Sequence, residues 1–140
     1  MDTKIEGYIS KQSIDRQAVM TAIHKIIIGE DKTVSPIVEP MMGKEMIIYK
    51  GKGLMKYGLS GVKDYMSLHV MPIYGSDILH KKYKALLPDA NFQKGCINFK
   101  TAEAMPLEIV KQLMADCSKI DLLKMKEDYL IEKKEENKMR

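Results

Sequence analysis

Residues 45–71 read EMIIYKGKGLMKYGLSGVKDYMSLHVM, and this stretch alone specifies most of the expected sheet. It contains three runs that are rich in β-branched, aromatic and other apolar residues, over 45–50, 54–60 and 65–71. Short glycine-containing connections separate the runs, as is typical of β-hairpins. The stretch therefore predicts an antiparallel meander of three strands, which ends at Pro72 because proline cannot donate a ladder hydrogen bond.

Helical patterns flank the meander on both sides. Before it, apolar residues recur every three or four positions over 14–28, and Gly29 suits the left-handed residue beyond a helix end. Pro36 and Pro40 predict an irregular connection from this helix to the first strand. Four elements are expected after the meander: a helix over 76–87, a strand over 95–100, a helix over 106–118 and a helix from 120 that frays over 132–140. The order α-β-β-β-α-β-α-α predicts an α+β fold, an antiparallel sheet of about four strands with helices packed on it.

The composition fits one domain over residues 1–140. The chain includes 35 Leu, Ile, Val and Phe residues, which is too many for a wholly disordered protein. No apolar run approaches the roughly 18 residues of a membrane span, and the first residues lack the pattern of a secretory signal. We therefore expect a cytoplasmic protein with no membrane partner, in which Cys96 and Cys117 are reduced thiols.

The net charge of +4 is concentrated in the middle of the chain. Residues 41–100 contain 10 lysines and 4 acidic residues, which gives that segment a net charge of +6. Lysines interleaved with aromatic residues are typical of proteins that bind single-stranded nucleic acid. The segment contains no arginine, however, and several of its tyrosines are expected to face the core. We therefore do not expect nucleic acid as the partner, and the charge instead favours a small anionic molecule.

Alternation along the predicted strands divides the sheet into an apolar face and a mixed polar face. The apolar face, which is the expected core, comprises Ile47, Tyr49, Met55, Tyr57, Leu59, Met66, Leu68, Val70, Ile97 and Phe99. The opposite face carries cations, hydroxyls, an imidazole, a thiol and an amide: Lys50, Lys56, Tyr65, Ser67, His69, Lys94, Cys96 and Asn98. Two interpretations of this polar face stay open. It is either a platform for a small anionic ligand or a solvated, partly helix-covered surface on which lysine stems lie over apolar groups.

His69 and Cys96 could together form a nucleophilic pair on the polar face. A cysteine nucleophile needs a base or a positive charge beside its sulfur, because an ordinary thiol is mostly protonated at neutral pH. No third, orienting residue is evident, so we expect a non-enzymatic binding domain rather than an enzyme. The three histidines do not have the spacing of metal ligands, and we expect His24 and His80 at the surface and no bound cofactor.

Several segments of the chain resemble, in order, the YdhG-like family, a bacterial domain of unknown function. They are YKGK at 49–52, KDYMSLHVMPIY at 63–74, residues 79–88, FQKGCINF at 92–99 and the Pro106-Leu107 pair before a helix, so the resemblance covers about residues 14–118. The resemblance implies a compact cytoplasmic α+β domain. Some members of the family have been discussed as frataxin-like iron chaperones, so it also implies iron binding or delivery as an alternative function. The residues add no support to iron, because weak iron sites need clustered carboxylates and the acidic groups here are interleaved with lysines.

Overall fold

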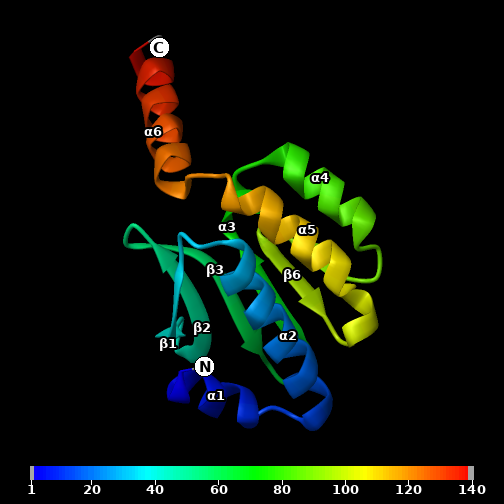
Figure 1. Ribbon diagram of the computed structural model, residues 1–140. Helices are drawn as coiled ribbons and strands as arrows, with labels where there is room; N and C mark the ends of the chain where they lie inside the picture. The colour runs from blue at the N-terminus through cyan, green and yellow to red at the C-terminus, as the bar shows by residue number, and fades with distance from the viewer. Residues whose placement is uncertain (1, 139–140) are drawn as a thin grey trace.

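The structure, a computed structural model, describes residues 2–138. Its centre is a six-stranded antiparallel sheet with the strand order β1-β2-β3-β4-β6-β5 (Figure 1). The strands are β1 (Ser35–Met41), β2 (Lys44–Gly51), β3 (Leu54–Gly61), β4 (Met66–Val70), β5 (Asn91–Gln93) and β6 (Cys96–Phe99). The predicted α+β class and antiparallel pairing are therefore confirmed.

Six α-helices accompany the sheet within the described residues. They are α1 (Thr3–Ser10), α2 (Ile14–Glu30), α3 (Met71–Tyr74), α4 (Asp77–Leu86), α5 (Leu107–Ser118) and α6 (Leu122–Lys138). Figure 1 shows α2 and α5 next to each other across one face of the sheet, and α1 at one end of it. α6 projects away from the rest of the molecule. None of the described helices is long and apolar enough to cross a membrane.

The hydrophobic core lies between the sheet and the pair formed by α2 and α5. The buried apolar side chains that α1, α2, α4 and α5 contribute all belong to one cluster with the inward residues of the strands. In this cluster Tyr49, Tyr57 and Leu68 of the sheet are fully buried. The predicted apolar face of the sheet is thus confirmed, with the exception of Met55, which lies outside the cluster.

We call the opposite side of the sheet the outer face. One row of cross-strand partners on it runs from Ile48 through Gly58, His69 and Cys96. A second row contains Ser60, Ser67 and Asn98. Met46 and Ile48 are buried but lie outside the core cluster, so they pack on the outer face rather than against the helices.

The prediction of about four strands was wrong because two edge strands were missed. Residues 36–40 were expected to be irregular, yet β1 contains both Pro36 and Pro40. A strand at the edge of a sheet tolerates proline, because only one side of it needs to donate hydrogen bonds. At the other edge, β5 has three residues, too few to show an alternating pattern.

The helix boundaries also differ from the predictions. α1 was not predicted at all, and α2 continues through Gly29 to Glu30 instead of ending at 28. The third strand of the meander ends at Val70, after which α3 begins. Residues 132–138, predicted to fray, belong to α6, while the remainder of that tail, residues 139–140, lies outside the described residues.

A β-bulge in β3 changes which face its first residues occupy. Tyr49 pairs with Tyr57, but the next residue of β2, Lys50, pairs with Met55, so Lys56 is an extra residue on β3. Inserting one residue into a strand shifts the alternation of its side chains by one position. As a result Lys56 lies on the same side as Tyr57, toward the helices, whereas Met55 moves to the outer face.

Candidate functional site

The buried carboxylate of Asp31 lies directly after α2 and binds residues from the adjoining loop and from β3. Asp31 is fully buried directly after α2, and its Oδ2 accepts hydrogen bonds from Tyr57 Oη at 2.6 Å and from Lys56 Nζ at 2.8 Å. Its Oδ1 accepts from the backbone N of Thr33 at 3.0 Å and from Thr33 Oγ1 at 2.5 Å. Four donors therefore satisfy both oxygens, as a buried charge requires.

The pKa of Asp31 reflects these contacts. Burial alone raises the pKa of a carboxyl group, because it disfavours the charged form. Hydrogen bonds from Lys56, Thr33 and Tyr57 outweigh burial here and hold the pKa of Asp31 below its usual value. Asp31 is consequently a carboxylate at neutral pH.

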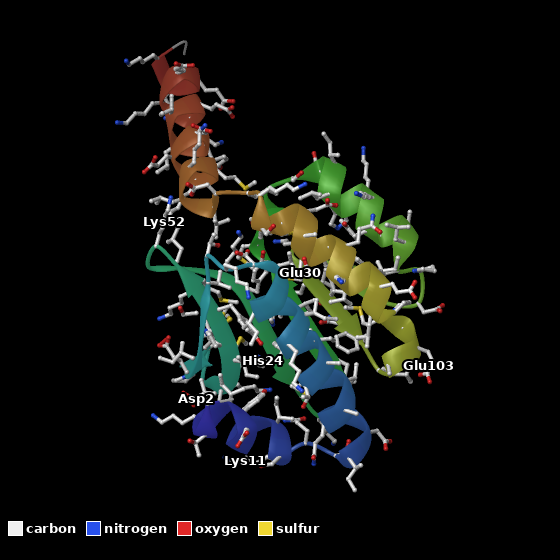
Figure 2. The ribbon with its side chains drawn as sticks, in the orientation of Figure 1. Asp2, Lys11, His24, Glu30, Lys52 and Glu103 are labelled. Carbon is white, nitrogen blue, oxygen red and sulfur yellow. The ribbon has the colours of Figure 1, made fainter. Side chains whose placement is uncertain are left out.

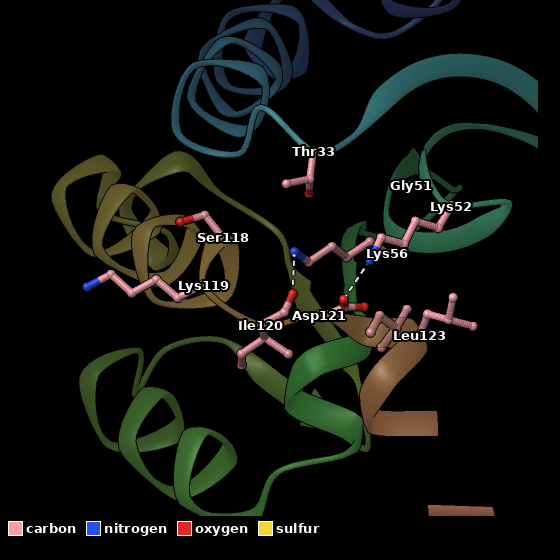
Figure 3. Close-up of a pocket in the computed structure, with 10 residues that line it drawn as sticks. Thr33, Gly51, Lys52, Lys56, Ser118, Lys119, Ile120, Asp121 and Leu123 are labelled. Carbon is pink, nitrogen blue, oxygen red and sulfur yellow. Dashed lines mark hydrogen bonds and ion pairs between the residues drawn. The ribbon is translucent and has the colours of Figure 1, made fainter. Parts of the chain in front are cut away.

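The ammonium of Lys56 lies at the inner end of a pocket between the β2–β3 turn and the α5–α6 junction (Figure 3). The pocket has a volume of about 150 Å³ and is lined by Thr33, Gly51, Lys52, Lys56, Ser118, Lys119, Ile120, Asp121, Leu122 and Leu123. The Lys56 side chain is only 5% exposed, and its Nζ also donates to the carbonyl of Ile120 at 2.9 Å.

Two features shape the rim of this pocket. Lys52, in the β2–β3 turn, donates to Asp121 Oδ2 at 2.6 Å, and Asp121 also caps the first turn of α6 by accepting from the backbone N of Lys124. Figure 2 shows Lys52 at the turn below the base of α6. Gly51 forms one wall, where a Cβ atom would stand 2.7 Å from the backbone oxygen of Thr33. Only glycine permits such a close approach of two backbones.

The outer face brings together four of the residues predicted for a ligand site. Ser67 Oγ donates to Asn98 Oδ1 at 2.8 Å, and His69 Nδ1 lies 2.9 Å from Cys96 Sγ. These two cross-strand pairs are adjacent on β4 and β6. Tyr65 is partly exposed and lines, with Asn98, a separate hollow of about 300 Å³ beside β5.

The predicted cations do not join these four residues. Lys56 was predicted on the polar face, and this placement was wrong because the bulge turns it toward the helices. Lys50 does lie on β2, but it pairs with Glu39 of the edge strand β1. Lys94 occupies the β5–β6 turn with a φ of 55°. The basic character expected of the polar face is therefore largely absent from it.

His24 is not at the surface, contrary to the sequence-based expectation. It is 1% exposed between α2 and the sheet (Figure 2), where its Nδ1 lies 2.6 Å from Tyr49 Oη. Burial lowers the pKa of His24, so the imidazole is neutral at pH 7. Its role is to satisfy the hydroxyl of Tyr49 inside the core.

Cys96 should react slowly with alkylating agents at pH 7. Burial raises the pKa of the Cys96 thiol and lowers the pKa of His69, so the neutral pair predominates over a thiolate–imidazolium pair. We expect the rate of iodoacetamide labelling, followed by peptide mass spectrometry, to be below that of a free cysteine at pH 7 and to rise steadily above pH 9.

Cys117 provides the internal control for this measurement. Its thiol is fully buried under the helices, and burial raises its pKa to about 12, so it should label only when the protein unfolds. If Cys96 is labelled faster than a model thiol at pH 7, the assignment of a neutral pair is contradicted. That result would instead support Cys96 as a nucleophile.

The residues of the pocket around Lys56 were missed by sequence reasoning. Asp31 follows an apolar helix and Thr33 follows it by two positions, a pattern that does not differ from an ordinary helix end. Asp121 directly precedes α6 and is far from Asp31 and Thr33 in the sequence. One feature of the sequence could have indicated this pocket. Lys52 lies between two glycines, a pattern that predicts a cation on a tight turn.

Comparison with protein-family models, with curated proteins and with solved structures found no match to this chain. The resemblance to the YdhG-like family therefore stays a prediction. Within residues 2–138, no group of three or more His, Cys, Asp and Glu side chains is placed to hold a metal ion. The iron-chaperone alternative consequently still depends on the resemblance alone.

Proposed function

We propose that the protein is a non-enzymatic binding domain for a small anionic ligand, and that the acidic group of the ligand binds to Lys56 in the pocket at the α5–α6 junction. The preference for an anionic ligand comes from the charge of the sequence. The position differs from the polar sheet face that the sequence indicated, because the bulge moves Lys56 to the other side of the sheet.

The observation that carries the proposal is the incomplete coordination of a buried ammonium. A lysine ammonium has three N–H donors. Within residues 2–138, Lys56 directs two of them to Asp31 and to the carbonyl of Ile120, which leaves the third donor without a hydrogen-bond partner at the inner end of the pocket. A carboxylate or phosphate oxygen would complete the coordination with a charge-assisted hydrogen bond, which is stronger than a bond between neutral groups.

The surroundings favour an anion of limited size. The ammonium group of Lys52 lies at the rim of the same pocket, and Asp121 is the one exposed carboxylate among the described residues that line it. A volume of about 150 Å³ accommodates an acidic group and a few further atoms rather than a large cofactor. Lys52 can turn from Asp121 to the ligand, because both side chains are substantially exposed.

Backbone NMR shift mapping tests this assignment directly. Phosphate, a nucleoside monophosphate and a dicarboxylate would each be titrated into the ¹⁵N-labelled protein. We expect the largest shifts at Thr33, Gly51 and residues 118–123, and smaller ones at Ser67 and Asn98. The variant Lys52→Gln should weaken binding, whereas Lys84→Gln, at an exposed site on α4, should not. No shift at millimolar concentration, or shifts confined to the outer face, would contradict the pocket as the binding site.

Replacing Asp121 by Asn should tighten anion binding. The change removes the carboxylate that competes for Lys52, and the amide oxygen can still cap α6. Hydrogen bonds from Lys52 and from the backbone hold the pKa of Asp121 below its usual value, so the competing charge is present throughout the neutral range. Because exposed ion pairs are weak, we expect a decrease in Kd of about two- to fivefold, measured by the same titration.

The matched control for Asp121→Asn is Asp64→Asn, which removes one carboxylate before β4 and outside the pocket lining. This variant has the same net charge as Asp121→Asn but should change the Kd much less. An equal decrease in Kd in both variants would mean that only the overall charge of the protein matters.

A further inference from the structure

Within the described residues, α6 packs against the rest of the protein only near its N-terminal end. Leu122, Leu123 and Met125 are half-buried, whereas every residue from Lys126 to Lys138 is exposed. Figure 1 accordingly shows the remainder of this helix extending away from the sheet and from the other helices. The position of the whole helix therefore depends on a few contacts at that end.

The carboxylate of Asp121 connects this end of α6 to the β2–β3 turn. Its Oδ2 accepts from Lys52 Nζ at 2.6 Å, and its Oδ1 accepts from the backbone N of Lys124 at 3.1 Å, so the same side chain binds the turn and caps the helix. One turn further along, Met125 lies against Gly75, where an added Cβ atom would overlap its Sδ. If α6 moved from this seated position, Asp121 would separate from Lys52.

The segment that holds α6 is also a wall of the Lys56 pocket. All six residues over 118–123 line the pocket, and Figure 3 shows Asp121 and Ile120 on opposite sides of the approach to Lys56. Lys56 Nζ donates to the carbonyl of Ile120 at 2.9 Å, which fixes the chain just before Asp121. Movement of α6 would therefore begin after Ile120 and leave the inner end of the pocket in place.

We propose that anion binding in the Lys56 pocket releases α6 from its seated position, because the ligand and Asp121 compete for the ammonium of Lys52. The inference rests on the proposed function and adds a mode of regulation to the same site. Without ligand, Lys52 binds Asp121 and α6 is seated. With ligand, Lys52 turns to the anion, Asp121 loses its partner on the turn, and the two negative charges repel each other.

Coupling between the pocket and α6 has to be reciprocal. If anion binding favours the released helix, any change that releases the helix must strengthen anion binding by the same factor. The contact that is exchanged is an exposed ion pair, so we expect this factor to be about two- to fivefold. A partner that held α6 in its seated position would weaken anion binding to a similar extent.

Pulsed EPR measures the release of α6 in the protein of residues 1–140. Nitroxide labels would be attached through Lys84→Cys on α4 and Lys134→Cys on α6, both at exposed positions, in a Cys96→Ser background. Cys117 is fully buried and stays unlabelled while the protein is folded. We expect each of the three anions that shifts the pocket amides to broaden the distribution of distances between the labels. Chloride at equal ionic strength is the reference, because salt alone weakens an exposed ion pair.

Two variants should release α6 in the absence of ligand. Asp121→Asn breaks the ion pair with Lys52, so the distance distribution should be broad before any anion is added. Met125→Ala removes the contact with Gly75 but changes no residue that lines the pocket. It should broaden the distribution and also lower the Kd of the anion, by no more than about two- to fivefold. Leu130→Ala, a truncation at an exposed position of the same helix, is the matched control and should change neither quantity.

The possible results distinguish this coupling from the proposed function itself. If an anion shifts the pocket amides but leaves the distance distribution unchanged, the coupling is wrong and the binding site stands. A broadened distribution in Met125→Ala with an unchanged Kd would also overturn the coupling. If none of the three anions shifts a pocket amide, the proposed function is wrong and the coupling is wrong with it.

Discussion

Lys56→Met should lower the free energy of unfolding by about 3–5 kcal/mol at pH 7, the cost of leaving a buried charge without its partner. The substitution keeps the length of the side chain but removes the ammonium, so Asp31 would retain only Tyr57 and Thr33 as donors in a fully buried site. Urea unfolding followed by circular dichroism measures the change. The control, Lys133→Met, breaks the exposed pair with Glu136 and should cost no more than about 1 kcal/mol.

The pH dependence of the free energy of unfolding of Lys56→Met shows whether the unpaired carboxylate of Asp31 causes the loss of stability. In the parent protein the pKa of Asp31 is below its unfolded value, so the stability that it contributes is present above about pH 4 and is lost as the pH falls through the folded pKa. Without the ammonium, burial should instead raise the pKa of Asp31 above its unfolded value. The difference in the free energy of unfolding between the parent protein and Lys56→Met should therefore become smaller from pH 7 to pH 5. A difference independent of pH would mean that lost packing, and not the unpaired carboxylate, destabilises the variant.

A double variant keeps this test decisive if Lys56→Met does not fold. Asp31→Asn combined with Lys56→Met removes both charges, and the amide oxygen can still accept from Thr33 while the amide NH2 donates to the hydroxyl oxygen of Tyr57. Because replacing both members of a buried pair costs much less than removing one, the double variant should be more stable than Lys56→Met alone. A double variant that is equally unstable would contradict the account.

Ile5→Ala should destabilise the protein by about 2–5 kcal/mol, although Ile5 lies only five positions into the chain. The side chain is 1% exposed and joins the core cluster together with Tyr8 and Ile9 of α1. α1 is anchored further by Tyr8 Oη, which accepts from the backbone N of Gly61 at 3.1 Å, and by Asp2 Oδ1, which caps the helix. Denaturant unfolding measures the loss.

Ile14→Ala supplies an identical substitution at a nearby position. Ile14 begins α2 but is 83% exposed, so its truncation should change the free energy of unfolding by no more than about 0.5 kcal/mol. Similar losses in the two variants would show that α1 does not contribute to the core in solution.

The sequence predicted the parts of the fold that depend on local pattern. The alternation of residues 45–71 gave the three central strands, and the apolar stripe from Val19 to Ile27 gave α2. α1 was missed because one turn of apolar residues, Ile5, Tyr8 and Ile9, does not establish a helical period. The edge strand β1 was missed because its two prolines are tolerated only at a position that depends on the whole sheet.

The candidate sites were predictable only in part, for a physical reason that lies in β3. Strict alternation correctly placed Ser67, His69, Cys96 and Asn98 on one face, because β4 and β6 pair without irregularity. Strict alternation placed Met55 and Lys56 on the wrong faces, because the bulge depends on how β3 pairs with β2. No residue in β3 indicates the bulge from the sequence alone. The contacts of Lys56 with Asp31 and Ile120 join segments that are far apart in the sequence.

The bulge has a consequence for how the Lys56 pocket can be gained or lost over evolutionary time. Substitution of another lining residue alters the pocket but leaves the Lys56 ammonium in place. Deletion of the single extra residue in β3 would instead restore regular alternation, and it would withdraw the ammonium from the pocket altogether. An insertion or deletion of one residue between Gly53 and Tyr57 is therefore the change that would separate relatives having this pocket from relatives lacking it.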